Sequence, residues 1–190
     1  MANEYLVNAA DLTSIADAIR EKGKATGQLV FPDEFVAAIR DMSSGKVRNI
    51  DFDLTAWTKK NPYPSREYTE GTYDLSNKTL RGYVTGGYQH VVMVTNEKID
   101  FFAYDTLNFT YDLDKSLIDN GAIIVKVSTS NGDPTDSTCV VSQQIYDAGT
   151  NVNVSIDVSS IDGNYYLWIG LITWGDLGTV NFEVSNLSLK

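Results

Sequence analysis

Between residues 49 and 190, apolar and polar positions alternate with the period of two that is typical of β-strands. In Thr106–Leu113, for example, Leu107 and Phe109 alternate with Asn108 and Thr110. About ten such segments, separated by turn signals and with no helical pattern among them, predict a mainly β, antiparallel two-sheet sandwich. The expected strands are 50–58, 66–75, 79–84, 90–95, 106–113, 122–129, 137–146, 151–158, 163–176 and 179–189, with a bulge near Ser185.

The segment 163–176 differs from the other strands because both of its faces are apolar. One face carries Leu167, Ile169 and Leu171, and the other carries Tyr166, Trp168, Gly170, Ile172 and Trp174. An ordinary half-solvated strand is apolar on one side only. Two interpretations follow: the strand is buried on both sides, or its aromatic side is a platform that lines a groove.

Near the N-terminus the apolar period changes to that of a helix. Helices are predicted over 8–22, after an Asn8 cap, and from Pro32, a residue tolerated in the first turn. We therefore expect a small two-helix unit (1–43), a linker (44–48) and the β-sandwich (49–190). The helical unit is too small to bury its apolar surface alone, so it should attach to a copy of itself or to a larger assembly, or else pack on its own sandwich. The residues expected to make this contact are Leu12, Ile15, Ile19, Phe31, Phe35 and Ile39.

The net charge and the start of the chain restrict the partners and the location that can be expected. Fifteen Lys and Arg against 25 Asp and Glu give a net charge of −10, which disfavours nucleic acid and anionic membranes as partners. The start of the chain lacks the basic and apolar regions of a signal peptide, so the protein is expected to be made in a bacterial cytoplasm and to remain there or leave within a particle.

Catalysis finds little support among the residues. His90 is the only histidine and Cys139 the only cysteine, so zinc sites with several histidines and intrachain disulfides are excluded. Outward carboxylates on an acidic sandwich are usually just solvated, and we predict no enzyme activity, no cofactor and no metal centre. A structural Ca²⁺ is the one ion that Asp-rich turns such as 131–136 could hold, with solvated turns as the alternative.

Non-covalent sugar binding is the better hypothesis, because pyranose rings stack on flat aromatic side chains. The candidate ligand-binding residues are Trp174, Trp168, Tyr166, Tyr63, Trp57 and Tyr88. For Trp168 an alternative stays open, in which the ring fills the core between the two sheets.

The N-terminal run Tyr5–Lys22, with Ile-Ala-Asp-Ala-Ile-Arg, and the later Phe31-Pro-Asp-Glu-Phe35 resemble a short N-terminal module of tail- or baseplate-associated proteins. These proteins come from phages and prophages of Gram-positive, often gut, bacteria. The resemblance covers about a fifth of the chain and implies an attachment role, with other virion proteins as partners of residues 1–43 and a closed homo-oligomer such as a trimer.

The segments 104–113 and 180–189 are similar to strands of the jelly-roll sandwiches used as carbohydrate-binding modules. This resemblance implies a jelly-roll fold and a glycan ligand. Such modules often hold a structural Ca²⁺ through an Asp of the final strand, whereas this chain has Ser185 and Asn186 there. The resulting hypothesis is a virion protein whose sandwich binds a host cell-surface glycan. The alternative is a purely structural decoration or assembly protein of the virion without a glycan ligand.

Overall fold

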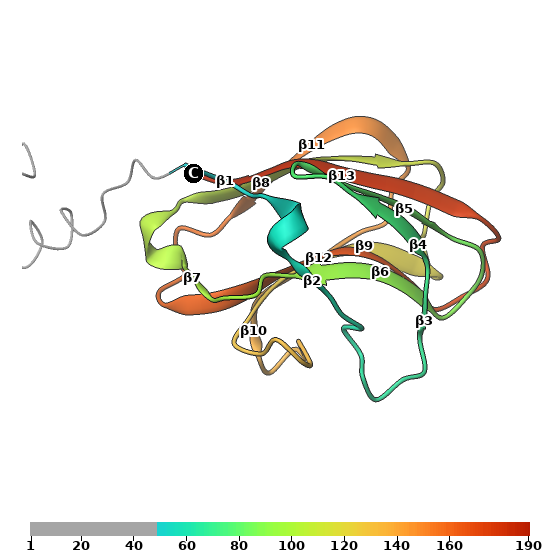
Figure 1. Ribbon diagram of the computed structural model, residues 1–190, viewed down its shortest axis with the longest axis horizontal. Helices are drawn as coiled ribbons and strands as arrows, with labels where there is room; N and C mark the ends of the chain where they lie inside the picture. Colours follow the sequence, from blue (N-terminus) through green and yellow to red (C-terminus); the bar gives the residue numbers. More distant parts are fainter. Residues whose placement is uncertain (1–48) are drawn as a thin grey trace, which may run out of the picture. The chain divides into compact units, whose positions relative to one another are not determined.

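The structure is a computed structural model that describes residues 49–190, and in this range the chain forms two β-sheets stacked face to face (Figure 1). The expected mainly β, antiparallel sandwich is therefore confirmed. The predicted helices, the linker and the attachment residues Leu12, Ile15, Ile19, Phe31, Phe35 and Ile39 lie outside the described residues. No helix within 49–190 is long and apolar enough to cross a membrane.

The first sheet, sheet A, has the strand order β11-β8-β13-β5-β4, and β1 also pairs with β13. All of its pairs are antiparallel. Its strands are β1 (Ile50–Asp51), β4 (Thr72–Leu75), β5 (Thr79–Val84), β8 (Thr106–Leu113), β11 (Gly149–Asp157) and β13 (Val180–Leu189).

The second sheet, sheet B, has the order β10-β9-β12-β6-β2, with β3 beside β6 and β7 beside β12. Its pairs are antiparallel except for β3 with β6. Its strands are β2 (Thr58–Lys59), β3 (Thr69–Glu70), β6 (Gln89–Val94), β7 (Ile99–Asp100), β9 (Gly121–Ser128), β10 (Cys139–Ile145) and β12 (Asn164–Thr173).

Two expected strands are wrong in detail. The segment 50–58 is interrupted by a 3₁₀ turn at Leu54–Ala56, which begins at Asp53, whose side chain accepts the backbone N–H of Thr55. The segment 66–75 is divided at Gly71, so that β3 joins sheet B and β4 joins sheet A. A side chain at Gly71 would lie 2.7 Å from the carbonyl oxygen of Tyr83, which explains why the chain crosses between the sheets at a glycine. The bulge expected near Ser185 is present, since the register of β13 against β8 shifts between Ser185 and Ser188.

The hydrophobic core lies between the sheets and is built from the inward side of each alternating strand. Leu107 and Phe109 of β8 and Val180 and Phe182 of β13 face it from sheet A. From sheet B the core receives Leu167, Ile169 and Leu171 of β12 and Ile123, Val125 and Val127 of β9.

The outer face of sheet B is also apolar, and two long connections cover it. A second buried cluster there contains Trp168 and Ile172 of β12, together with Tyr68 from the connection 60–68. Strand β12 is thus buried on both sides. This is the first of the two interpretations of its sequence. Figure 1 shows the connection that leads into β3 and the connection that leads into β10 extending outward from this sheet.

Two side chains of the covered face bind the connections through backbone carbonyl groups. The indole N–H of Trp168 donates to Ser130 O at 3.0 Å, and Nζ of the buried Lys126 donates to Pro134 O at 2.8 Å. The same Lys126 ammonium lies 5.0 Å from the ring centre of Tyr63, a cation–π distance. Buried polar atoms are thereby satisfied, and the segments 60–68 and 130–138 are held on the sheet.

Gly170 lies in the middle of β12 with a φ of 151°, in a region that side chains rarely occupy. A Cβ atom at this position would lie 2.1 Å from the carbonyl oxygen of Val91 on the neighbouring strand β6. The pairing of β12 with β6 therefore needs a glycine here.

We predict that Gly170→Ala lowers the free energy of unfolding by at least about 3 kcal/mol, because backbone of the central strand must move to admit the methyl group. Chemical denaturation of the full chain measures this loss. Gly132→Ala is the matched control, since no atom lies within 4 Å of its added Cβ, and it should change the stability little. An equal effect of the two substitutions would contradict the close packing described for β12.

Candidate functional site

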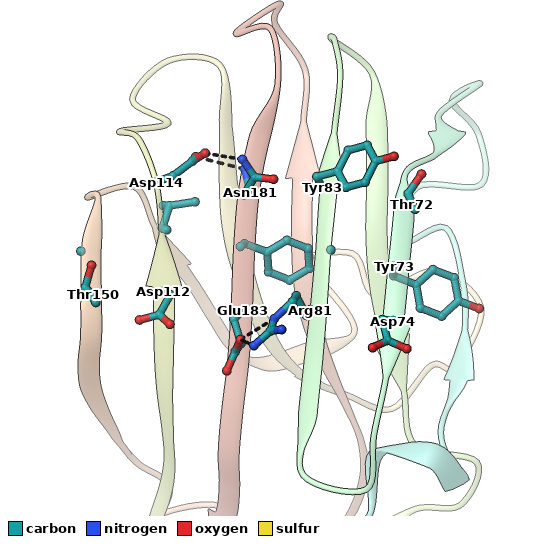
Figure 2. Close-up of a pocket in the computed structure, with 14 residues that line it drawn as sticks. Thr72, Tyr73, Asp74, Arg81, Tyr83, Asp112, Asp114, Thr150, Asn181 and Glu183 are labelled. Atoms are coloured by element: carbon teal, nitrogen blue, oxygen red, sulfur yellow. Dashed lines mark hydrogen bonds and ion pairs between the residues drawn. The ribbon is translucent and has the colours of Figure 1, made fainter.

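The outer face of sheet A carries an open groove of about 500 Å³. It crosses the strands β11, β8, β13, β5 and β4, and Figure 2 shows the side chains that line it projecting from these strands. Alternation along each strand explains this lining: in β5 Leu80 and Val84 face the core while Arg81 and Tyr83 face outward. Most of the side chains that line the groove thus come from the outward half of each strand pattern, and Tyr73, Leu113 and Phe182 of the inward half also border it.

One row of side chains, the tyrosine row, consists of Asp114, Asn181, Tyr83 and Thr72. Asn181 is paired with Tyr83, and Tyr83 with Thr72, on successive strands. The backbone N–H and Nδ2 of Asn181 donate to the two carboxylate oxygens of Asp114, at 3.0 and 2.6 Å. Tyr83 remains 40% exposed, which leaves part of its ring free to contact a ligand.

A second row, the charged row, consists of Asp112, Glu183, Arg81 and Asp74. Register places these residues opposite one another on the four adjacent strands β8, β13, β5 and β4. Nε of Arg81 donates to Oε2 of Glu183 at 2.7 Å, and Nη2 donates to the same oxygen. The hydrogen bonds that Arg81 donates to Glu183 raise the pKa of its guanidinium. Asp112 accepts the backbone N–H of Asn151 on β11.

The two rows make a flat, hydrogen-bonding surface with one aromatic ring. Neighbouring strands lie about 4.8 Å apart and residues two positions apart on a strand about 6.7 Å, so the rows cover about 14 by 7 Å. Carboxylate, amide and hydroxyl groups at this spacing can bind several hydroxyl groups of one extended ligand, while Tyr83 can stack on it. Such a surface suits reversible binding of a polar, ring-containing molecule.

None of the six aromatic residues predicted from the sequence lies in this groove. Trp168 is 0% exposed and lies on the outer side of sheet B beneath the connections, not between the sheets. Trp57 is also buried and packs edge-on against Phe52, with ring centres 5.3 Å apart. The expectation that Trp168 contacts a ligand is therefore corrected, because its ring is sealed from solvent. Trp57 lines a separate cavity of about 530 Å³ together with Asn96 and Glu97, and its contact with a ligand stays a prediction.

The other predicted aromatics surround the covered face of sheet B. Thr173 of β12 pairs with Gln89 of β6, so Trp174 and Tyr88 stand at neighbouring strand ends. Tyr68 links Tyr88 to Tyr63, with ring centres 5.8 and 6.0 Å away. Three predicted residues thus lie at one end of this face, and Tyr88 is 57% exposed there.

Trp174 and Tyr166 are both half-buried, and each is held by a neighbouring group. The indole N–H of Trp174 donates to Asp119 O at 2.8 Å. Tyr166 has the ammonium of Lys98 5.6 Å from its ring centre. These contacts leave each ring only partly accessible, and neither residue lines the groove of sheet A.

The sequence did not reveal the residues of the groove as a site. Alternation in 79–84 and 179–189 does place Arg81, Tyr83, Asn181 and Glu183 on outward faces. What was missing is the order of the strands, since β13 and β5 are about a hundred residues apart and become neighbours only in the folded sheet. No local pattern predicts that adjacency.

Within residues 49–190 no group of three or more His, Cys, Asp or Glu side chains is placed to hold a metal ion. His90, on the covered side of β6, is 6% exposed, and its Nδ1 is buried without a hydrogen-bond partner from the described residues. Burial lowers the pKa of His90, opposed by the nearby Glu70 and assisted by Lys59. Cys139 is half-buried, and burial raises the pKa of its thiol, which does not favour a nucleophilic thiolate.

No protein-family model matches the chain, and no curated protein matches it. Similar solved structures include the xylan-binding module CBM86 of the gut symbiont Roseburia intestinalis, at 18% identity over 75% of this chain and 96% of that one, with a TM-score of 0.47. A CBM4 structure is 15% identical over 72% of this chain and 94% of that one, with a TM-score of 0.49. Xylanase 10C of Cellvibrio japonicus is 12% identical over 74% of this chain and 28% of that one, with a TM-score of 0.43. These likenesses, all at 18% identity or less, concern the sandwich fold alone.

The buried histidine predicts a stability that depends on pH. Because the pKa of His90 is lower in the folded than in the unfolded chain, the unfolded state binds the proton more readily. The contribution of neutral His90 is complete above a pH of about 6.5 and is lost as the pH falls below that value.

We therefore expect the free energy of unfolding to fall between pH 6.5 and pH 5, by at most about 1.4 kcal/mol per pH unit for this one group. Denaturant titrations of the full chain at several pH values measure the slope. In His90→Leu the slope over this range should be smaller. Identical slopes in the two proteins would show that His90 does not resist protonation.

Proposed function

We propose that the sandwich binds a host cell-surface glycan non-covalently in the groove of sheet A. The observation that carries this proposal is the pair of rows across four strands, in which polar acceptors surround the half-accessible Tyr83 ring. Ring stacking supplies contact area at a small entropic cost, and the neighbouring carboxylate and amide groups bind hydroxyl groups.

The setting that we propose is a phage virion, with residues 1–43 attached to other virion proteins and the chain assembled as a homo-oligomer, such as a trimer. This part of the proposal rests on the N-terminal resemblance. An open, shallow groove implies weak binding at one site, and several copies on one particle would raise the overall avidity. Detection of this chain in purified particles by mass spectrometry tests the setting, and its absence from them would contradict it.

Glycan-array binding by the full chain tests the recognition itself. We expect Tyr83→Ala to weaken binding of the best glycan about tenfold, because the variant loses the stacking ring. The matched control is Phe102→Ala, which removes a ring of similar exposure, 38%, outside the groove and should bind as the parent does.

A third variant, Trp174→Ala, separates the two faces of the molecule. If Trp174→Ala loses binding and Tyr83→Ala keeps it, the ligand binds at the aromatic residues around sheet B and the groove assignment is wrong. If no glycan binds to the full chain although it is part of the particle, the purely structural virion role replaces the proposal.

A further inference from the structure

The charge of the groove restricts the ligands that it can accept. Its two rows contain four carboxylates, those of Asp74, Asp112, Asp114 and Glu183, against the single guanidinium of Arg81. Four negative charges and one positive charge leave an excess of three negative charges within one open groove. The whole chain, at −10, adds to this negative potential.

Some of the hydrogen-bond donors of the groove are used within it. Nε and Nη2 of Arg81 both donate to Glu183, and the Nδ2 of Asn181 donates to Asp114. The acceptors are not used to the same extent. No hydrogen bond or ion pair from residues 49–190 reaches the carboxylate of Asp74, and the bond from Asn151 engages one oxygen of Asp112 and leaves the other. Asp74 and the second oxygen of Asp112 are therefore available to accept hydrogen bonds from a ligand.

Asp74 and Asp112 stand at the two ends of the charged row, on either side of the Arg81–Glu183 pair (Figure 2). The charged row runs beside the tyrosine row, at a distance of two residues, or about 6.7 Å, along the strands. A sugar stacked on Tyr83 can thus place a substituent of the same or the next sugar unit over one of these carboxylates.

From this geometry we propose that the glycan is one whose sugar units carry protonated amino groups, with Asp74 and Asp112 as the residues that bind them. This inference rests on the proposed glycan-binding function and names its ligand class. A charged N–H donor to a carboxylate makes a stronger hydrogen bond than a neutral hydroxyl group does. Glycans that carry carboxylate, sulfate or phosphate groups are repelled by the same charge.

Three probes with one backbone test the proposal on the full chain: β-1,4-linked hexamers of glucose, of glucosamine and of glucuronate. Calorimetry or a competition assay at a pH of about 6 gives each dissociation constant. We expect the glucosamine hexamer to bind about tenfold more tightly than the glucose hexamer, and the glucuronate hexamer not to bind. The advantage of the amine should shrink as salt is raised to about 1 M, where charges are screened within about 3 Å.

The double variant Asp74→Asn, Asp112→Asn retains the side-chain shapes and removes both charges. It should bring the affinity for the glucosamine hexamer to within about threefold of that for the glucose hexamer, whose own affinity should change little. The control Asp136→Asn removes one exposed carboxylate outside the groove and should leave the preference intact.

The outcomes separate the two proposals. If the glucose hexamer binds as tightly as the glucosamine hexamer, or if the preference survives in the double variant, the inference about amines is wrong while glycan binding stands. If none of the three hexamers binds and the glycan array is also empty, the proposed function fails together with this inference.

Discussion

Strand β12 has to bury two apolar faces, and the rest of the sandwich is arranged to meet this requirement. Its odd-numbered residues, such as Leu167, fill the core against sheet A, as in any sandwich. Its even-numbered residues, such as Trp168 and Ile172, need a second cover, which the connections 60–68 and 130–138 supply. The buried Lys126 and the Trp168 indole hold that cover through carbonyl groups, so the polar cost of closing this face is offset by hydrogen bonds.

The outer side of sheet A is left as the open face. Its strands follow simple alternation, so their outward side chains are polar. The fold places β8 and β13 beside the hairpin of β4 and β5, from which both are remote in sequence. The resulting rows place an accessible tyrosine beside ion-paired and unpaired carboxylates. Sheet B thus has a covered outer face, while the outer face of sheet A is polar and open to a ligand.

The fold could be predicted from the sequence because alternation is a local signal. Thr79–Val84 and Thr106–Leu113 were predicted at their observed bounds, and the bulge in β13 followed from a phase change at Ser185. The breaks at Leu54 and Gly71 were missed, since a 3₁₀ turn and a crossing between sheets depend on contacts with distant residues. The double burial of β12 was one of two interpretations that the sequence left open.

The site was harder to predict for a physical reason. The exposure of an aromatic ring depends on the segments that fold over it. Trp168 is covered by segments that are far from it in sequence, and Trp57 packs against Phe52. Tyr83 looked like an ordinary strand residue, and only the neighbours Asn181 and Thr72 give its ring a context. Strand order, which no local pattern contains, determines which polar residues become one surface.

The account depends on recognition at the open face of sheet A and not at the covered face of sheet B. Backbone and indole N–H signals in an NMR titration of the full chain with its best-binding glycan locate the ligand directly. The account predicts the largest shifts at Arg81, Tyr83, Asp112 and Asn181, with the indole signals of Trp57, Trp168 and Trp174 unchanged. Large shifts at the Trp174 indole and at Tyr88, with the groove residues unaffected, would contradict it.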